Sequence, residues 1–220
     1  MKYKISYLSC ILQYGLFILL STIAGPGMGQ RKASTDRVTL EKNGASDFNL
    51  AQNMKLGGSN LDFHGFEGYS FSFHGREAKI IRPKVTAVGH PWVWRSRFWG
   101  HEPQVDIGLL EHGYHVVYCD VAELFGNEEA LTIWDGFYRK LQDGGLNKKS
   151  AMEGMIPLLH VVGDKDDVVP IAENALPFAE EIRRAGGSIE IIHKPEVGHH
   201  PHCLVDPSPI IDFILKANSK

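Results

Sequence analysis

An aspartate and a histidine in the C-terminal part of the chain have the types and spacing of an acid–base pair. Asp166 follows the apolar run 158–162, and His199 follows the apolar run 189–192. The carboxyl ends of neighbouring parallel strands meet at one edge of a sheet, where α/β proteins build their sites. A carboxylate that holds an imidazole in one tautomer makes it a general base. We therefore expect Asp166 to orient His199, with Asp167 as the alternative acid.

The segments that must position this pair alternate between strand-like and helix-like patterns along the chain. Alternating aromatic and polar residues at 69–73, a turn at 75–76 and a return segment at 78–81 predict a hairpin. Further strands are expected at 85–88, 114–119, 158–162 and 189–192, and helices at 105–112, at 127–141, around Pro177 and from 206. This alternation predicts an α/β fold with a mostly parallel sheet covered by helices on both faces.

The longest predicted helix, 127–141, has signals at both of its ends. Asn127 is suited to cap the N-terminus, and Gly144-Gly145 is suited to end the helix. The buried stripe is expected from four side chains: Leu131, Trp134, Tyr138 and Leu141.

Together these motifs resemble the α/β-hydrolase family, in a branch of exported prolyl-oligopeptidase-like or esterase-like proteins. The resemblance covers about residues 66–217 and is carried by Gly89–Arg95, Gly100–Pro103, Gly163–Pro170 and Val197–His202. It implies a three-layer fold and a serine hydrolase that acts on an ester or related acyl bond. It also implies Asp166 as the acid, His199 as the base, and the backbone N–H of Trp92 or Val93 as an oxyanion donor. The resemblance implies no cofactor and no metal.

The nucleophile of that family is missing from the sequence. No G-x-S-x-G pentapeptide occurs in the chain, and 153–155, where the elbow would begin, leads directly into 156–158. A strand–helix–strand unit needs about 30 residues, so central strand–helix units are missing as well. We expect an internal deletion or a mis-joined gene model, and a chain without serine-hydrolase activity. The lost layer should expose apolar residues at 116–117 and 158–162.

Three other residues have side chains that could act as nucleophiles. Ser150 lies between a lysine and the next strand without an elbow, and Ser96 lies near the expected oxyanion loop. Cys119 ends an apolar strand and is expected in the core. None of them has an evident base within hydrogen-bond reach, which an activated nucleophile requires.

Two functions of other classes stay open. One loop offers imidazole and thiolate groups, which are zinc ligands: His199, His200, His202 and Cys203. Their tight spacing argues against all four binding one ion. An aromatic cluster is formed by Trp92, Trp94, Phe98 and Trp99. Such a rim could stack on a small-molecule or carbohydrate-linked ester, in a binding remnant without catalysis.

Composition limits the remaining classes. The chain has 220 residues, with 43% hydrophobic and 22% charged residues, which is typical of a folded domain and argues against disorder. The net charge of −3 gives no basic surface for nucleic acid, and no nucleic-acid partner is expected.

The N-terminus has the order of a secretory signal peptide. Lys2 and Lys4 precede an apolar stretch at 5–24 that ends in small residues. We expect a signal peptide at 1–29, cleaved after Ala24 or Gly29, and a secreted or periplasmic protein with no stable membrane span after cleavage. A weakly structured lead-in is expected at 30–62, followed by a truncated hydrolase domain at 63–220.

Overall fold

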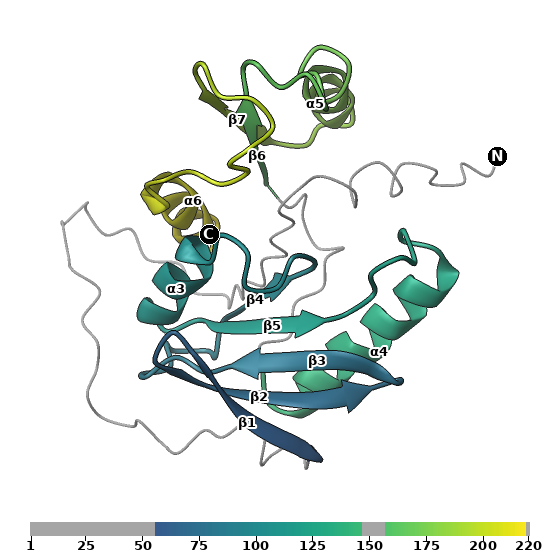
Figure 1. The fold of residues 1–220 in the computed structure, drawn as a ribbon, viewed down its shortest axis with the longest axis vertical. Helices are drawn as coiled ribbons and strands as arrows, with labels where there is room; N and C mark the ends of the chain where they lie inside the picture. Colours follow the sequence, from purple (N-terminus) through teal and green to yellow (C-terminus); the bar gives the residue numbers. More distant parts are fainter. Residues whose placement is uncertain (1–55, 147–156, 219–220) are drawn as a thin grey trace, which may run out of the picture.

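A computed structural model describes residues 56–146 and 157–218 of the chain. Seven strands and four helices lie in this part: β1 (Gly58–Phe63), β2 (Phe66–Phe73), β3 (Arg76–Ile81), β4 (Trp92–Arg95), α3 (Gln104–Glu111), β5 (His115–Cys119), α4 (Glu128–Asp143), β6 (Leu158–Gly163), α5 (Ala175–Arg184), β7 (Ile189–Lys194) and α6 (Ser208–Asn218). Five strands form one sheet in the order β1-β2-β3-β5-β4, and β6 and β7 form a second sheet (Figure 1). The expected signal peptide, Ser150 and the Met155–Ile156 junction lie outside the described residues.

The mixed α/β class is confirmed, but the expectation of a mostly parallel sheet is wrong for the described residues. The pairs β1–β2, β2–β3 and β3–β5 are antiparallel, and only β4–β5 is parallel within the larger sheet. The reason lies in two-residue turns, His64-Gly65 and His74-Gly75, in which both residues have positive φ. Such turns join strands into antiparallel hairpins. The two parallel pairs, β4–β5 and β6–β7, are each connected through a helix.

Two boundaries differ from the sequence-based expectation. Residues 85–88 form no strand, because the chain turns there: Val88 is 97% exposed, and Gly89 and His90 have positive φ. The next strand after β3 is β4, which begins only at Trp92. Strand β1 begins at Gly58, inside the expected lead-in, so the folded part starts before residue 63.

Helices cover both faces of the five-stranded sheet. On one face α4 packs against alternate side chains of β3, β4 and β5, while α3 and α6 pack against the intervening ones. Asn127 caps α4 as expected, since its side chain accepts the N–H of Ala130 at 3.0 Å. The expected stripe of α4 is wrong at Leu131, which is 40% exposed. The buried stripe consists of Ala130, Ile133, Phe137 and Leu141, with Trp134 and Tyr138 beside it.

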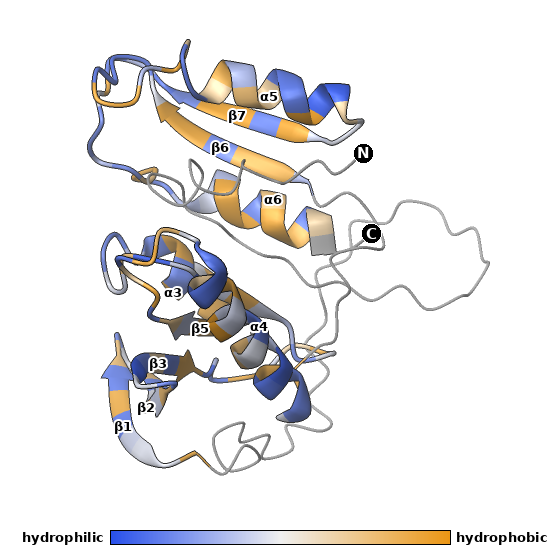
Figure 2. Cartoon of the chain, turned by 90° about the vertical axis from the view of Figure 1, so that its right-hand side faces the viewer, coloured by the Kyte–Doolittle hydropathy of each residue, from blue (hydrophilic) through white to orange (hydrophobic). Residues whose placement is uncertain are grey.

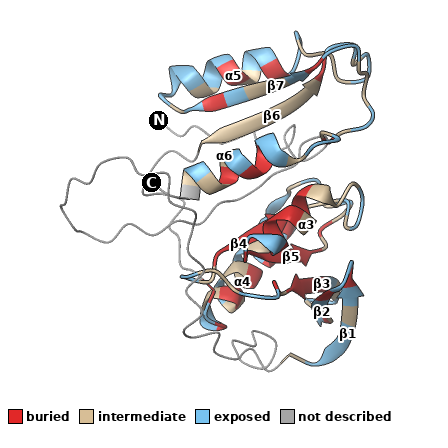
Figure 3. Cartoon of the chain, turned by 90° about the vertical axis from the view of Figure 1, so that its left-hand side faces the viewer, coloured by how far each residue is buried: buried red, intermediate tan, exposed pale blue. Residues whose placement is uncertain are grey.

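The two sheets differ in how well they are buried (Figure 3). Val116 and Val117 are fully buried in β5, so the expectation that they are exposed is wrong. Strand β6 is mostly hydrophobic (Figure 2), and its residues 158–162, expected to be exposed, are half-buried. Among the described helices, none has the length and apolar character needed to cross a bilayer.

Candidate functional site

Asp166 and His199 lie in contact at the edge where β6 and β7 end. The two strands are parallel, so the loops that follow Gly163 and Lys194 leave the sheet on the same side. The Oδ1 atom of Asp166 accepts the backbone N–H groups of Val168 and Val169 at 3.0 and 2.8 Å. Its Oδ2 atom lies 3.0 Å from Nδ1 of His199. The contact expected from the sequence is therefore confirmed.

This geometry fixes the direction of the His199 ring. A carboxylate only accepts hydrogen bonds, so the Nδ1 proton faces Asp166 and Nε2 faces away from it. Both side chains are largely buried, at 14% exposure for His199 and 13% for Asp166. Asp167, the alternative acid, is exposed, and Asp166 is the carboxylate that holds the ring.

Hydrogen bonds keep Asp166 ionised. Burial alone would raise its pKa, but the Val169 N–H, the His199 ring and the Val168 N–H together hold the pKa below its ordinary value. A negative charge is thus held beside the imidazole at neutral pH.

The loops that carry the pair pack backbone against backbone. The N–H of Lys165 donates to the Val197 carbonyl at 2.9 Å. A Cβ atom on Gly163 would lie 2.1 Å from the carbonyl oxygen of Gly198 and 2.6 Å from that of Val197. Because those obstacles are backbone atoms, only glycine lets the two loops approach this closely.

Two further imidazoles adjoin His199, and we call His199, His200 and His202 the histidine cluster. The Nε2 atoms of His199 and His202 are 3.4 Å apart. The ring centroids of His200 and His202 are 4.2 Å apart, and those of His199 and His200 are 4.9 Å apart. The Nε2 atom of the oriented His199 ring therefore lies next to the Nε2 atom of His202.

The loop after β4 supplies neighbours that the sequence did not assign. Glu102 accepts the N–H of His202 at 3.1 Å and also the N–H of Cys203. Burial would raise the pKa of Glu102, but these two backbone hydrogen bonds lower it below its ordinary value. His101 is 3.3 Å from the same carboxylate, and the Phe98 ring stacks on His202. These contacts join segments about a hundred residues apart, so no local pattern in the sequence predicts them.

The loop that carries the histidine cluster is also fixed by hydrogen bonds from β7. Lys194, a buried residue at the end of β7, donates from Nζ to the carbonyls of Pro201 and His202. The pKa of His202 is lowered, first by burial and then by the nearby His200. The Cys203 side chain is buried in the core beside α3 and α6, and burial raises its thiol pKa. The structure thus separates Cys203 from the imidazoles with which the sequence grouped it.

The expected oxyanion residues lie at the wrong end of their strand. Trp92 and Val93 begin β4 and pair in register with His115 and Val116 of β5. The loop that reaches His202 follows Arg95, at the opposite end of β4. Sites in parallel sheets form at the carboxyl ends of strands, so the assignment of these two amides is not supported.

The expected aromatic rim is not one surface. Trp92 and Trp94 are 1% and 8% exposed and pack in the core under α4. Phe98 is exposed and Trp99 is half-buried. A stacking platform of all four rings is therefore excluded.

The alternative nucleophiles gain no support. Cys119 is buried in β5, and burial followed by the charge of Asp120 raises its thiol pKa to about 12. A thiol of that pKa stays protonated and unreactive at neutral pH. Ser96 is a half-buried loop residue after β4.

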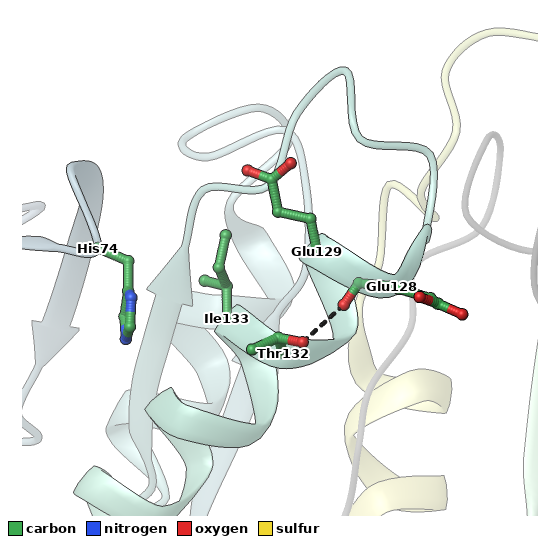
Figure 4. A pocket seen from close by; sticks show the side chains of 5 residues that line it. All are labelled: His74, Glu128, Glu129, Thr132 and Ile133. Carbon is green, nitrogen blue, oxygen red and sulfur yellow. Dashed lines mark hydrogen bonds between the residues drawn. The ribbon is translucent and has the colours of Figure 1, made fainter.

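A separate open hollow lies at the start of α4 (Figure 4). Its lining consists of His74, Glu128, Glu129, Thr132 and Ile133. The Thr132 hydroxyl donates to the Glu128 carbonyl at 2.8 Å, the ordinary bond of an exposed helical threonine. The hollow shares no residue with the Asp166–His199 pair.

The chemistry of the site therefore rests on an oriented imidazole with two imidazole neighbours. Asp166 and His199 have the geometry of the acid and the base of a triad. No protein-family model, curated protein or solved structure matches this chain.

Proposed function

We propose that this chain is an exported protein derived from an α/β-hydrolase, which keeps the acid and the base of a triad but has no serine hydrolase activity. The observation that carries the proposal is the 3.0 Å contact between Asp166 and His199, in loops that follow consecutive parallel strands. General bases in acyl transfer need this orientation of the ring. Asp166 holds the ring through Nδ1, so Nε2 of His199 is the atom that would accept a proton from a nucleophile.

The arrangement of the sheets also supports a missing central unit. Strand β4 is the last strand of the larger sheet, and β6 is an apolar, half-buried strand with one partner. The chain between β5 and β6 contains α4 and the junction where the family would place its elbow. A strand inserted at this junction would pair with the edge strand β4 of the larger sheet and with β6 of the smaller sheet.

Inactivity follows from the composition of the site. Triad members act as a unit, and removing the nucleophile costs about six orders of magnitude in turnover. The second oxyanion amide belongs to the residue after the nucleophile, so it is lost as well.

The test uses the purified full chain, a fluorophosphonate probe and short-chain aryl esters. We expect neither labelling nor turnover above a heat-denatured control. Labelling or turnover that disappears in His199→Gln would overturn the proposed inactivity. DNA sequencing across the Met155–Ile156 codons tests the missing unit, since an encoded elbow there would show that the deletion lies in the gene model.

A further inference from the structure

We propose that the histidine cluster binds a zinc ion through His199, His200 and His202. One ligand atom from each residue lies within 4.8 Å of the other two. The proposal stands on this geometry and does not depend on descent from a hydrolase.

The spacing of two of the nitrogens, those of His199 and His202, matches a tetrahedral ion. Zinc takes imidazole nitrogens at about 2.0–2.1 Å, so two ligands of a tetrahedral site lie about 3.3 Å apart. The Nε2 atoms of His199 and His202 are 3.4 Å apart. Three protein ligands would leave the fourth position for water, as in open zinc sites.

Asp166 and Glu102 supply the support that such a site needs. Ligating histidines usually donate their second nitrogen to a carboxylate, which fixes the ring and strengthens the ligand. His199 already makes that contact through Nδ1 with Asp166. Glu102 holds the backbone N–H of His202. The Lys194 ammonium donates to the carbonyls of Pro201 and His202 in the same loop.

A second group, His101, Glu102 and His202, also has ligand atoms within 4.8 Å of one another. We favour the cluster of three histidines because both Glu102 oxygens already accept backbone N–H groups. His101 is exposed, and its Nε2 atom lies 3.3 Å from the Glu102 oxygen that already accepts the His202 N–H.

The chain contains its own matched control. His193 also holds a carboxylate at Nδ1, with Asp164 Oδ1 at 2.7 Å, and it belongs to neither ligand group. A carboxylate–histidine pair alone therefore occurs twice, and neighbouring imidazoles distinguish His199 from His193.

The experiment is equilibrium dialysis of the full chain, prepared without a polyhistidine tag, against zinc chloride, with zinc counted per chain. We expect one tightly bound zinc ion, retained in His193→Gln and His101→Gln and lost in His200→Gln and His202→Gln. His200 is exposed, so its replacement leaves the fold intact, which thermal unfolding confirms. Asp166→Asn should weaken zinc binding by about 10–100-fold.

Three results would overturn the proposal. These are no stoichiometric zinc in the unmodified chain, retention of zinc in His202→Gln, or an equal loss in His193→Gln. Loss in His101→Gln with retention in His199→Gln would overturn the choice of ligands. Because zinc is counted directly, an unexpected esterase activity would contradict the proposed function and leave this result in place.

Discussion

Arg95 is a buried cation that organises the loop leading to the histidine cluster. Its guanidinium donates to the carbonyls of Arg97 and Phe98 at 3.1 Å and to that of His101. Its Nη1 atom lies 3.2 Å from Asp106 at the start of α3. Burial raises the pKa of Asp106 to about 6, against the attraction of Arg95. One side chain thus fixes the segment that places Phe98, His101 and Glu102.

Arg95→Met should destabilise the protein by about 3–5 kcal/mol, because it leaves the Asp106 carboxylate and several carbonyls buried without their donor. Urea unfolding at pH 7 measures the change. The double variant Arg95→Met/Asp106→Leu should recover part of the loss, since it removes both charges. A double variant less stable than Arg95→Met would contradict this account of the pair.

His115 predicts an acid-sensitive component of stability. It is fully buried in β5, and burial lowers its pKa to about 4, below the value of 6.5 in an unfolded chain. As the pH falls from 6.5 towards 4, the unfolded state takes up a proton and the folded state does not. The stability present above pH 6.5 is therefore lost in this window, by about 3 kcal/mol in total.

His115→Gln should flatten the pH dependence of the unfolding free energy between pH 6.5 and 4, whatever it does to stability at pH 7. Urea titrations at several pH values measure the slope. His64→Gln, at an exposed turn, is the control and should keep the full slope. An unchanged slope in His115→Gln would assign the acid sensitivity to other groups.

At the scale of elements, the sequence predicts segments well and their pairing less well. The hairpin, α4 with its cap, and both strands that carry Asp166 and His199 follow from local pattern and spacing. The first hairpin was missed because the residues of β1 are mostly exposed and polar, with burial only at Phe63. The available signal in the sequence was the His64-Gly65 pair, whose residues both adopt positive φ in the structure. Glu102 could not be found, since its role depends on contact with a loop distant in sequence.

Gly163→Ala should be more damaging than Gly108→Ala, although both glycines are buried. The added methyl at position 163 meets two backbone carbonyl oxygens, which move only if the loops of Asp166 and His199 separate. At position 108 it meets Cδ1 of Ile211 at 2.3 Å, the movable end of a side chain between α3 and α6. Thermal unfolding of both variants measures the difference. Equal effects would show that the approach of the two loops is adaptable.

At the scale of the whole molecule, the two sheets differ in burial, and we expect the less buried sheet to unfold locally more often. Strand β5 has partners on both sides, and all its residues are buried. Among the described strands, β6 pairs with β7 alone, and its apolar residues are half-buried (Figure 3). Two-stranded units are marginal by themselves, and local opening begins where buried contacts are fewest.

Hydrogen–deuterium exchange of the full chain should therefore show peptides of β6 losing protection before peptides of β5. In the buried strands β3, β4 and β5, exchange should approach the rate set by global unfolding. In β6 and β7, exchange should occur through local unfolding that costs less free energy. The measurement is repeated at two protein concentrations, because a free apolar strand edge is a template for pairing with another chain. Protection of β6 that rises with concentration would mean that a second copy covers this edge. Protection equal to that of β5 at both concentrations would contradict the prediction, since it would require β6 to open only with the whole molecule.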